Sequence, residues 1–289
     1  MITIIIHIFP HEVDDYIRVI GKLNESKITT NGIEIKSLLN INKKVLAKID
    51  NVEESLQKYK FASNNSRITA HNHISDKYQG VNDHRRDCIS ASNKNDTLIF
   101  LDVDLYFNTN YLMNLLKYNS QLKVDNDYYV ITPQIVRLWD KTWDILVNEN
   151  FIDEDLGFYN TVDLHKTTSS CYGECELLKI NKFKWAGGWF TCMSAKLAKY
   201  IGIPNSLGPY GPDDTHMMNC CEYLKNNNIN VNQFVLKNLI VCEDRTICSK
   251  NKKYISPNRY RQIASTHMTK EYNNFKKRVN ADIYKNNES

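Results

Sequence analysis

The sequence lacks any apolar run approaching the roughly 18 to 20 residues that a helix needs to cross a bilayer. Its apolar opening, MITIIIHIF, has no basic segment before it and passes directly into PHEVDD, unlike a secretory signal peptide. The eight cysteines fit no zinc-finger or disulfide spacing. These absences argue against a membrane-spanning, secreted or disulfide-built protein, and we expect a soluble cytoplasmic protein with free thiols.

Neither a strong excess of one charge nor an internal repeat marks the chain. The net charge of its 289 residues is +4, too small to indicate nucleic-acid binding by itself, and the apolar fraction of 42% is ordinary for a globular protein. Basic residues do gather at residues 250–289, where ten Lys or Arg stand against three acids for a net charge of +7. Such a tail is typical of a solvated helix, or of a surface that meets a phosphate, an acidic acceptor or a membrane.

Strand and helix patterns alternate along the first hundred residues. Apolar, β-branched runs predict strands at 2–9, 33–42, 67–74 and 97–104. Helical spacing of apolar residues predicts a helix at 10–26, and a further helix is expected at 80–94, before the fourth strand. The first strand shows no alternation, as expected when both faces are covered. This βαβ order predicts an α/β fold with a parallel sheet and helices on its faces.

Two acids, Asp102 and Asp104, stand at the carboxyl end of the fourth predicted strand, where parallel sheets bind their ligands. A period of two puts both side chains on the same side of an extended chain, so their repulsion has to be offset by a cation. Oxygen ligands suit a hard divalent ion whose shell substrate phosphates complete. No GxGxxG or Walker lysine motif follows the first strand, so a bound phosphate is expected to be held through this metal.

A second informative stretch is WAGGWF, in which Trp185 and Trp189 flank Gly187 and Gly188. Paired glycines indicate a close approach by a ligand or by another part of the backbone. The flanking tryptophans offer flat apolar faces on which a sugar ring can stack. The alternative is a packed turn with two core tryptophans.

Asp213 and Asp214 follow a Gly-Pro pair at the start of a helix predicted over 213–224. Helix capping explains one acid but leaves the second without a structural reason. A carboxylate at the rim of a pocket can act as general base toward a hydroxyl group. Farther back, Trp139 and Trp143 would lie one turn apart if helical, packing in the core or lining an acceptor cleft.

The order of these features resembles that of nucleotide-sugar glycosyltransferases of the GT-A fold, and is similar to inverting family-two-like enzymes and the β-1,4-galactosyltransferase group. The resemblance covers most of the chain and rests on motif order. It implies a Rossmann-like, mostly parallel central sheet with helices on both faces. It also implies a GT-A domain over 1–250, with a nucleotide-binding half at 1–105, an acceptor half at 106–250, and a basic tail at 251–289 on or near the active site.

The resemblance also implies roles for individual residues. Asp102 and Asp104 would hold Mn²⁺ or Mg²⁺ against the donor diphosphate, and His267 would be a further metal ligand, with His216 as the alternative. The nucleotide would be bound by Phe9, Pro10, Asn40, Asn42 and Arg86, and the substrate by Trp185, Gly187, Gly188, Trp189 and Asp213. Asp214 would be the general base and Asp213 its neighbour that orients the acceptor. Pro212 and Asp213 replace the glycine and glutamate of the family motif, so the acceptor pocket is expected to differ in shape.

The predicted function is metal-dependent transfer of a hexose from a nucleoside-diphosphate sugar, with UDP the commonest choice of the family, to an acceptor hydroxyl with inversion. A glycan, a lipid, a protein or a modified nucleobase remains open as the acceptor, with peripheral contact through the basic tail. Two alternatives remain. A nucleotidyltransferase would also pair a parallel sheet with metal-binding acids, and a non-catalytic module would bind sugar or nucleic acid through its tryptophans and basic tail.

Overall fold

The computed structural model describes residues 1–46, 48, 50–139, 144–147, 161–162, 175–181, 183, 189–243 and 257–287. The first hundred residues fold in the alternating order that their sequence predicts. The elements are β1 (Ile2–Ile8), η1 (Pro10–Glu12), α1 (Val13–Glu25), β2 (Ile33–Asn40), α2 (Val52–Asn64), β3 (Thr69–Ser75), α3 (Val81–Ala91) and β4 (Thr97–Leu101). The βαβ series is therefore confirmed.

The remainder of the chain adds strands to this sheet and helices over it. Its elements begin with β5 (Leu105–Phe107), α4 (Asn110–Asp125), β6 (Tyr128–Trp139), β7 (Asp144–Val147), β8 (Thr161–Val162) and β9 (Glu176–Ile180). They continue with β10 (Trp189–Ser194), α6 (Ala195–Ile201), η2 (Asn205–Leu207), α7 (Asp213–Asn226), β11 (Val231–Glu243) and α9 (Pro257–Asn287). The helix considered for Trp139 and Trp143 is not formed at Trp139, because that residue ends β6; Trp143 lies outside the described residues.

One mixed sheet runs through the molecule in the order β3-β2-β1-β4-β10-β6-β11-β5, with β7, β8 and β9 joined at its side. Along this path the pairs β3-β2, β2-β1, β1-β4 and β6-β11 are parallel, and the other three are antiparallel. The α/β class with a mostly parallel central sheet is thus confirmed. The carboxyl ends of β1, β2, β3 and β4 meet along one edge, where residues that follow these strands come together.

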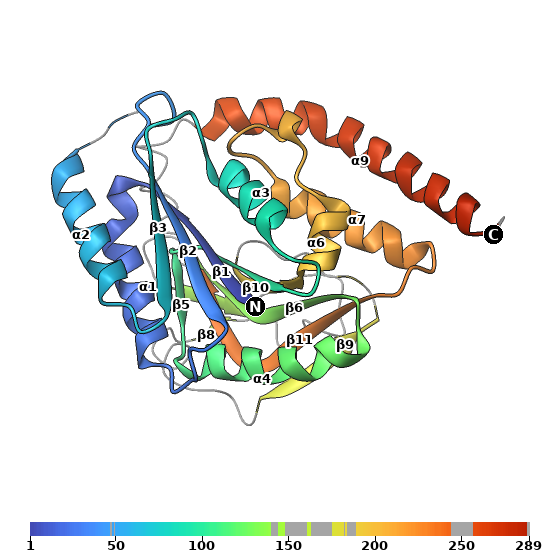
Figure 1. Cartoon of the computed structure of the whole chain (residues 1–289), viewed down its shortest axis with the longest axis horizontal. Helices are drawn as coiled ribbons and strands as arrows, with labels where there is room; N and C mark the ends of the chain where they lie inside the picture. Colours follow the sequence, from blue (N-terminus) through green and yellow to red (C-terminus); the bar gives the residue numbers. More distant parts are fainter. Residues whose placement is uncertain are drawn as a thin grey trace.

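Helices cover both faces of the sheet (Figure 1). On one face α1, α2 and α4 bury residues such as Tyr16, Tyr59 and Tyr111 against the even-numbered side chains of β1. On the other face α3, α6 and α7 pack on Ile5 and Phe100. Burial of apolar surface on this scale, at roughly 25 cal/mol per Å², is what holds the three layers together.

The basic tail forms α9, which lies along the outside of α7 in Figure 1. Phe275 and Val279 are buried against the α3, α6 and α7 layer. Arg278 donates to the carbonyl oxygens of Tyr200 and Ile201, at the end of α6. Part of the positive charge of the tail therefore binds the last carbonyls of α6, and the C-terminal end of a helix dipole attracts cations.

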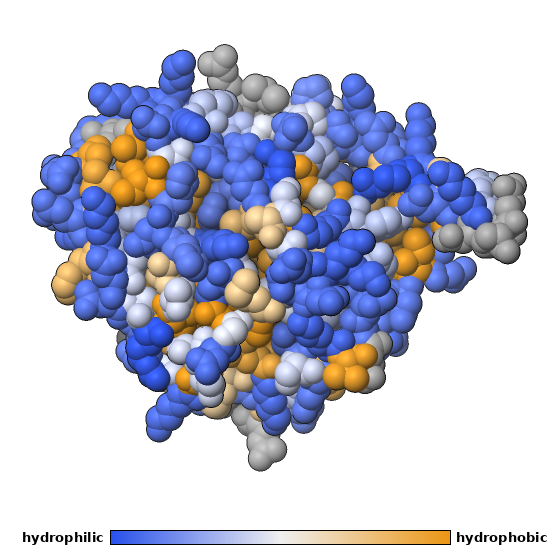
Figure 2. Space-filling model, in the orientation of Figure 1, coloured by the Kyte–Doolittle hydropathy of each residue, from blue (hydrophilic) through white to orange (hydrophobic). Residues whose placement is uncertain are grey.

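The face in Figure 2 is mostly hydrophilic, with scattered apolar patches. Large exposed apolar side chains among the described residues are Met1, Ile17, Phe61, Tyr78, Met113, Val124 and Tyr284. Within the same residues, every helix is too short or too polar to span a bilayer.

Candidate active site

The acidic pair lies where β4 leaves the sheet. All five residues of β4 are buried, and Asp102 follows directly at the carboxyl end of the strand. The Asp102 side chain is 38% exposed, and Val103 between the two acids is buried. The strand thus delivers a carboxylate to the edge where parallel sheets bind ligands.

Arg18 of α1 holds the turn that carries the acidic pair. Its guanidinium donates to the carbonyl oxygens of Val103 at 2.7 Å and Leu105 at 2.5 Å, and lies 4.2 Å from the ring centre of Tyr106. A planar guanidinium that binds two carbonyls fixes the direction of the turn between them. No sequence pattern singles out Arg18, because the carbonyls that it binds lie 85 and 87 residues away.

Arg85 of α3 joins the acidic pair to the second pair of acids. Its Nη2 donates to Asp102 Oδ1 at 2.7 Å, and its Nη1 donates to Asp213 Oδ2 at 2.9 Å. The Arg85 side chain is only 8% exposed. Burial lowers the pKa of Arg85, but the carboxylates of Asp213 and Asp102 outweigh it and raise that pKa above its ordinary value. Arg85 therefore stays charged and neutralises part of both acidic pairs.

Asp213 and Asp214 are the first two residues of α7, as predicted, with Pro212 as the N-cap residue. Neither acid caps the helix from outside, so the capping explanation fails for both, although acids in a first turn suit the helix dipole. Asp213 is buried at 3% exposure. Burial and the neighbouring Asp213 raise the pKa of Asp214 from 3.8 to about 7, and the Thr215 amide donates to its Oδ1 at 2.6 Å. A carboxyl with this pKa can accept a proton near neutral pH.

The N-terminus of α3 is fastened to the loop before α7. The Asn82 amide donates to the Pro209 carbonyl at 3.1 Å, and Asn82 Nδ2 donates to the Gly208 carbonyl at 3.1 Å. Gly80 approaches so closely that an added Cβ would lie 2.0 Å from the Pro209 oxygen. Only glycine fits here, so Gly80 and Asn82 set the distance between α3 and Asp213.

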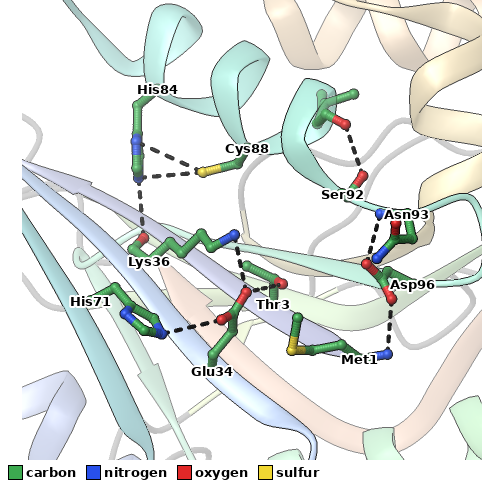
Figure 3. A network of polar contacts seen from close by, with 11 residues as sticks. Met1, Thr3, Glu34, Lys36, His71, His84, Cys88, Ser92, Asn93 and Asp96 are labelled. Carbon is green, nitrogen blue, oxygen red and sulfur yellow. Dashed lines mark hydrogen bonds and ion pairs between the residues drawn. The ribbon is translucent and has the colours of Figure 1, made fainter.

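Two histidines lie beside Arg85 between α3 and the sheet. His84 is 6% exposed and donates through Nε2 to the Lys36 carbonyl at 3.1 Å (Figure 3). Burial and the charge of Arg85 lower the pKa of His84 to about 4, although its bond to Lys36 opposes this. Burial, His84 and Arg85 also lower the pKa of His7, whose ring centre lies 6.4 Å from that of His84. Both rings are therefore neutral at pH 7.

We expect acidification to destabilise the wild type relative to a His84→Gln variant. Because the pKa of His84 falls from 6.5 unfolded to about 4 folded, the unfolded chain takes up a proton that the folded chain does not. At roughly 1.4 kcal/mol per pKa unit, about 3 kcal/mol of stability should be lost between pH 6.5 and pH 4. Urea unfolding of both proteins from pH 7 to pH 4 measures the difference. His71→Gln is the control, since the His71 side chain is 57% exposed. If it changed the loss of stability at low pH as much as His84→Gln does, that loss could not be attributed to the burial of His84.

The residues predicted to bind the nucleotide lie at the carboxyl ends of β1 and β2 and on α3. Phe9 is buried with Val45 and Leu46. Asn40 is fully buried; its Nδ2 donates to the Gln79 carbonyl and its Oδ1 accepts from the Asn42 amide at 2.8 Å. These two asparagines therefore shape the loop after β2.

Pro10 borders a cavity of about 240 Å³ between α1 and α2, which His11, Asn51 and Ser55 also line. Arg86 turns away from Asp102. It donates to Asp83 at 2.7 Å and to the carbonyls of Ile203 and Pro204. Its neighbour Arg85, which the sequence did not single out, is the arginine that contacts the acidic residues.

The predicted sugar-stacking residues fall largely outside the description. Trp185, Gly187 and Gly188 lie outside the described residues, and Trp189 begins β10 without a described side chain. His267 lies in α9 and His216 is buried in α7. Among the described residues, no three His, Cys, Asp or Glu side chains gather as a ready-made metal site. The two aspartates supply the hard oxygen donors that suit Mg²⁺ or Mn²⁺, and the Asp102 side chain is 38% exposed.

No protein-family profile and no curated protein sequence matches this chain. Its fold is similar to that of S. aureus TarS 1–349 in complex with UDP-GlcNAc (TM-score 0.51, 13% identity), and the match covers 84% of this chain and 58% of that fragment. It is also similar to GalNAc-T7 with UDP, GalNAc and Mn²⁺ (TM-score 0.56, 12% identity), where the match covers 84% of this chain and 43% of that one. A third similar structure is the mannosyltransferase PcManGT from Pyrobaculum calidifontis with GDP-Man and Mn²⁺ (TM-score 0.52, 11% identity), where the match covers 84% of this chain and 56% of that one.

The match covers about half of each of those three chains, from 43% to 58%. At 11 to 13% identity, the likeness concerns the fold. The chain has the GT-A fold of nucleotide-sugar glycosyltransferases, as its motif order predicted.

Proposed function

We propose that this protein transfers a hexose from a nucleoside-diphosphate sugar, with UDP as its nucleotide, to an acceptor hydroxyl, with inversion at the anomeric carbon. The observation that carries the proposal is the pairing of Asp102 with Asp213 through one buried guanidinium on a GT-A fold. Asp213 directly precedes Asp214, whose pKa of about 7 suits a general base, so the pairing links a carboxylate of the metal-binding type to the residue beside the proposed base. The fold by itself would support several activities.

Asp102 and Asp104 are the residues that would hold Mn²⁺ or Mg²⁺, because carboxylate oxygens suit these ions and Asp102 is 38% exposed at the carboxyl end of β4. A divalent ion bound there supplies Lewis-acid stabilisation of the charge that grows on the departing diphosphate. His267 remains our prediction for a further ligand, and His216 the alternative. Turnover and Mn²⁺ affinity of His267→Ala and His216→Ala would separate the two.

The chain's own part in the reaction is to position the acceptor and to remove its proton. Asp214 takes the proton of the acceptor hydroxyl while that oxygen forms a bond to the anomeric carbon. The bond from this carbon to the diphosphate oxygen breaks, and the nucleoside diphosphate leaves with the electron pair. Asp213, held by Arg85, keeps the start of α7 in place and orients the acceptor.

For the nucleotide we propose contacts from Phe9, Pro10, Asn40, Asn42 and Arg86. The cavity that Pro10 lines supports the choice of that residue, since Pro10 follows the end of β1. For the sugar and its acceptor we propose Trp185, Gly187, Gly188 and Trp189. The acceptor class, whether glycan, lipid, protein or modified nucleobase, remains open within this proposal, as does contact of the basic tail with a surface.

The test is a search for Mn²⁺-dependent release of nucleoside diphosphate from UDP-GlcNAc, GDP-Man and other nucleotide sugars. We expect release with at least one UDP-sugar, its loss with EDTA, and its loss in Asp104→Asn. Asp127→Asn is the matched control, because that carboxylate is 75% exposed and pairs with Lys196 at the surface. Release of pyrophosphate would point instead to a nucleotidyltransferase, and sugar binding without turnover would point to a binding module.

A further inference from the structure

The first half of α3 contacts both sides of the proposed site. Arg85 reaches Asp102 on the donor side and Asp213 on the acceptor side, which are 111 residues apart in the sequence. Gly80 and Asn82 hold the same helix against the loop that precedes Asp213. Resting on the proposed function, we propose that Arg85 is a positioning residue that couples metal binding at Asp102 to the carboxyl groups at the start of α7.

The guanidinium has the geometry for this role. Its two Nη atoms belong to one rigid plane, so the positions of the Asp102 and Asp213 carboxylates are fixed relative to each other. The Asp213 end is closed, with a side chain 5% exposed, whereas the Asp102 side chain is 38% exposed. One partner of Arg85 is therefore buried in the frame, and the other remains open to a ligand.

The single positive charge of Arg85 is shared between two carboxylates. A cation that draws on the Asp102 carboxylate leaves more of this charge to Asp213, and the low dielectric of a buried site strengthens the effect. Because coupling between two sites is reciprocal, a change in the charge of Asp213 should in turn alter the affinity of Asp102 for the cation. Removing the Asp213 charge leaves Arg85 free to pair fully with Asp102, which should weaken cation binding there.

The backbone contacts of α3 make the coupling depend on position as well as on charge. A side chain at Gly80 would force α3 away from Pro209, because its Cβ would lie 2.0 Å from the Pro209 oxygen and 2.6 Å from its carbonyl carbon. Arg85 lies five residues farther along the same helix. Gly80→Ala should therefore loosen the link to Asp213 without changing any charge.

The experiment measures Mn²⁺ affinity by titration calorimetry at pH 8, with Mn²⁺ alone as the probe. At this pH Asp214 is mostly ionised, since its pKa is about 7, so Asp213→Asn and Asp214→Asn each remove one charge. Asp214→Asn is the matched control, because the two Nη atoms of Arg85 donate to Asp213 and Asp102. We expect Asp213→Asn to weaken Mn²⁺ binding by about 5-fold or more, the lower range of measured couplings, and Asp214→Asn to weaken it clearly less.

The difference between the two variants should disappear in an Arg85→Lys background, because an ammonium cannot hold both carboxylates in one plane. It should also shrink in Gly80→Ala, which serves if Arg85→Lys does not fold, as checked by its melting midpoint. Equal effects of Asp213→Asn and Asp214→Asn in the wild-type background would overturn the coupling. By contrast, a wild type whose Mn²⁺ binding is absent, or is unchanged by Asp104→Asn, would overturn the proposed function itself.

Discussion

Asp214→Asn is expected to lower turnover by about 10²- to 10⁴-fold, the usual contribution of a general base, while donor and Mn²⁺ binding stay close to wild type. The change removes the proton acceptor but keeps the shape of the side chain and an oxygen that can accept from the Thr215 amide. Steady-state kinetics with saturating UDP-sugar, once the acceptor is identified, measure the loss. If turnover is unchanged, Asp214 is not the base.

The same variant should be more stable than the wild type at pH 8. Because burial and Asp213 raise the folded-state pKa of Asp214 from 3.8 to about 7, the folded chain retains a proton that the unfolded chain has lost. This carboxyl therefore costs stability increasingly as pH rises from about 4 to about 7, and by a constant amount above that range. Thermal melts of Asp214→Asn should exceed those of the wild type by a margin that grows over this window.

A rise in melting temperature together with a loss of turnover separates a lost base from a damaged fold. The pH profile adds a second check. As Asp214 loses its proton, kcat/KM of the wild type should rise with pH with a midpoint near pH 7, and Asp214→Asn should lack this rise. Asp127→Asn is the control, because a surface ion pair contributes about 0 to 1 kcal/mol and its loss should change neither quantity. A variant that loses both activity and stability would contradict the balance described for Asp214.

The parts of the site that the sequence predicted are those set by local pattern. β4 is a run of five buried residues, so the position of Asp102 at its end follows from strand periodicity and the βαβ order. Asp213 and Asp214 follow in the same way from the start of an amphipathic helix. Both inferences need only residues within one element and the rule that ligands bind at the carboxyl ends of strands.

The choice between Arg85 and Arg86 needed the orientation of α3, which its sequence signals only weakly. The buried face carries His84 and Arg85 as well as the apolar Cys88 and Ile89, so apolar periodicity is broken. A residue lies over the one four positions earlier in a helix, so Cys88 and Ile89 do indicate that His84 and Arg85 face the core. That signal could have identified Arg85.

The contact of Gly80 with Pro209 had no such signal. It joins residues 129 apart in the sequence, and a single glycine before a helix is equally expected of an ordinary turn or cap. The same holds for Arg18, whose partners are carbonyls of the turn after β4. Contacts with distant backbone depend on how α1, α3 and α7 pack, and no local pattern carries that information.

Arg85→Met is expected to destabilise the protein by about 3 to 5 kcal/mol, because breaking a buried ion pair leaves uncompensated charge behind. Asp213 loses its bond to Nη1 in a site that is 3% exposed, whereas Asp102 at 38% exposure can be solvated in part. Most of the cost should therefore come from Asp213. Urea unfolding at pH 7 measures the loss, and the unfolding midpoint should fall without a large change in slope.

The matched comparison removes the stranded charge. In Arg85→Met combined with Asp213→Asn, the carboxylate that suffers from the loss of Arg85 is neutral, so a large part of the stability should return. Adding Asp102→Asn should restore much less, because that side chain retains access to water. If Asp102→Asn rescued Arg85→Met as well as Asp213→Asn does, the two carboxylates would depend on Arg85 equally. The division between a closed acceptor end and an open donor end would then be wrong, and so would the direction of coupling inferred from it.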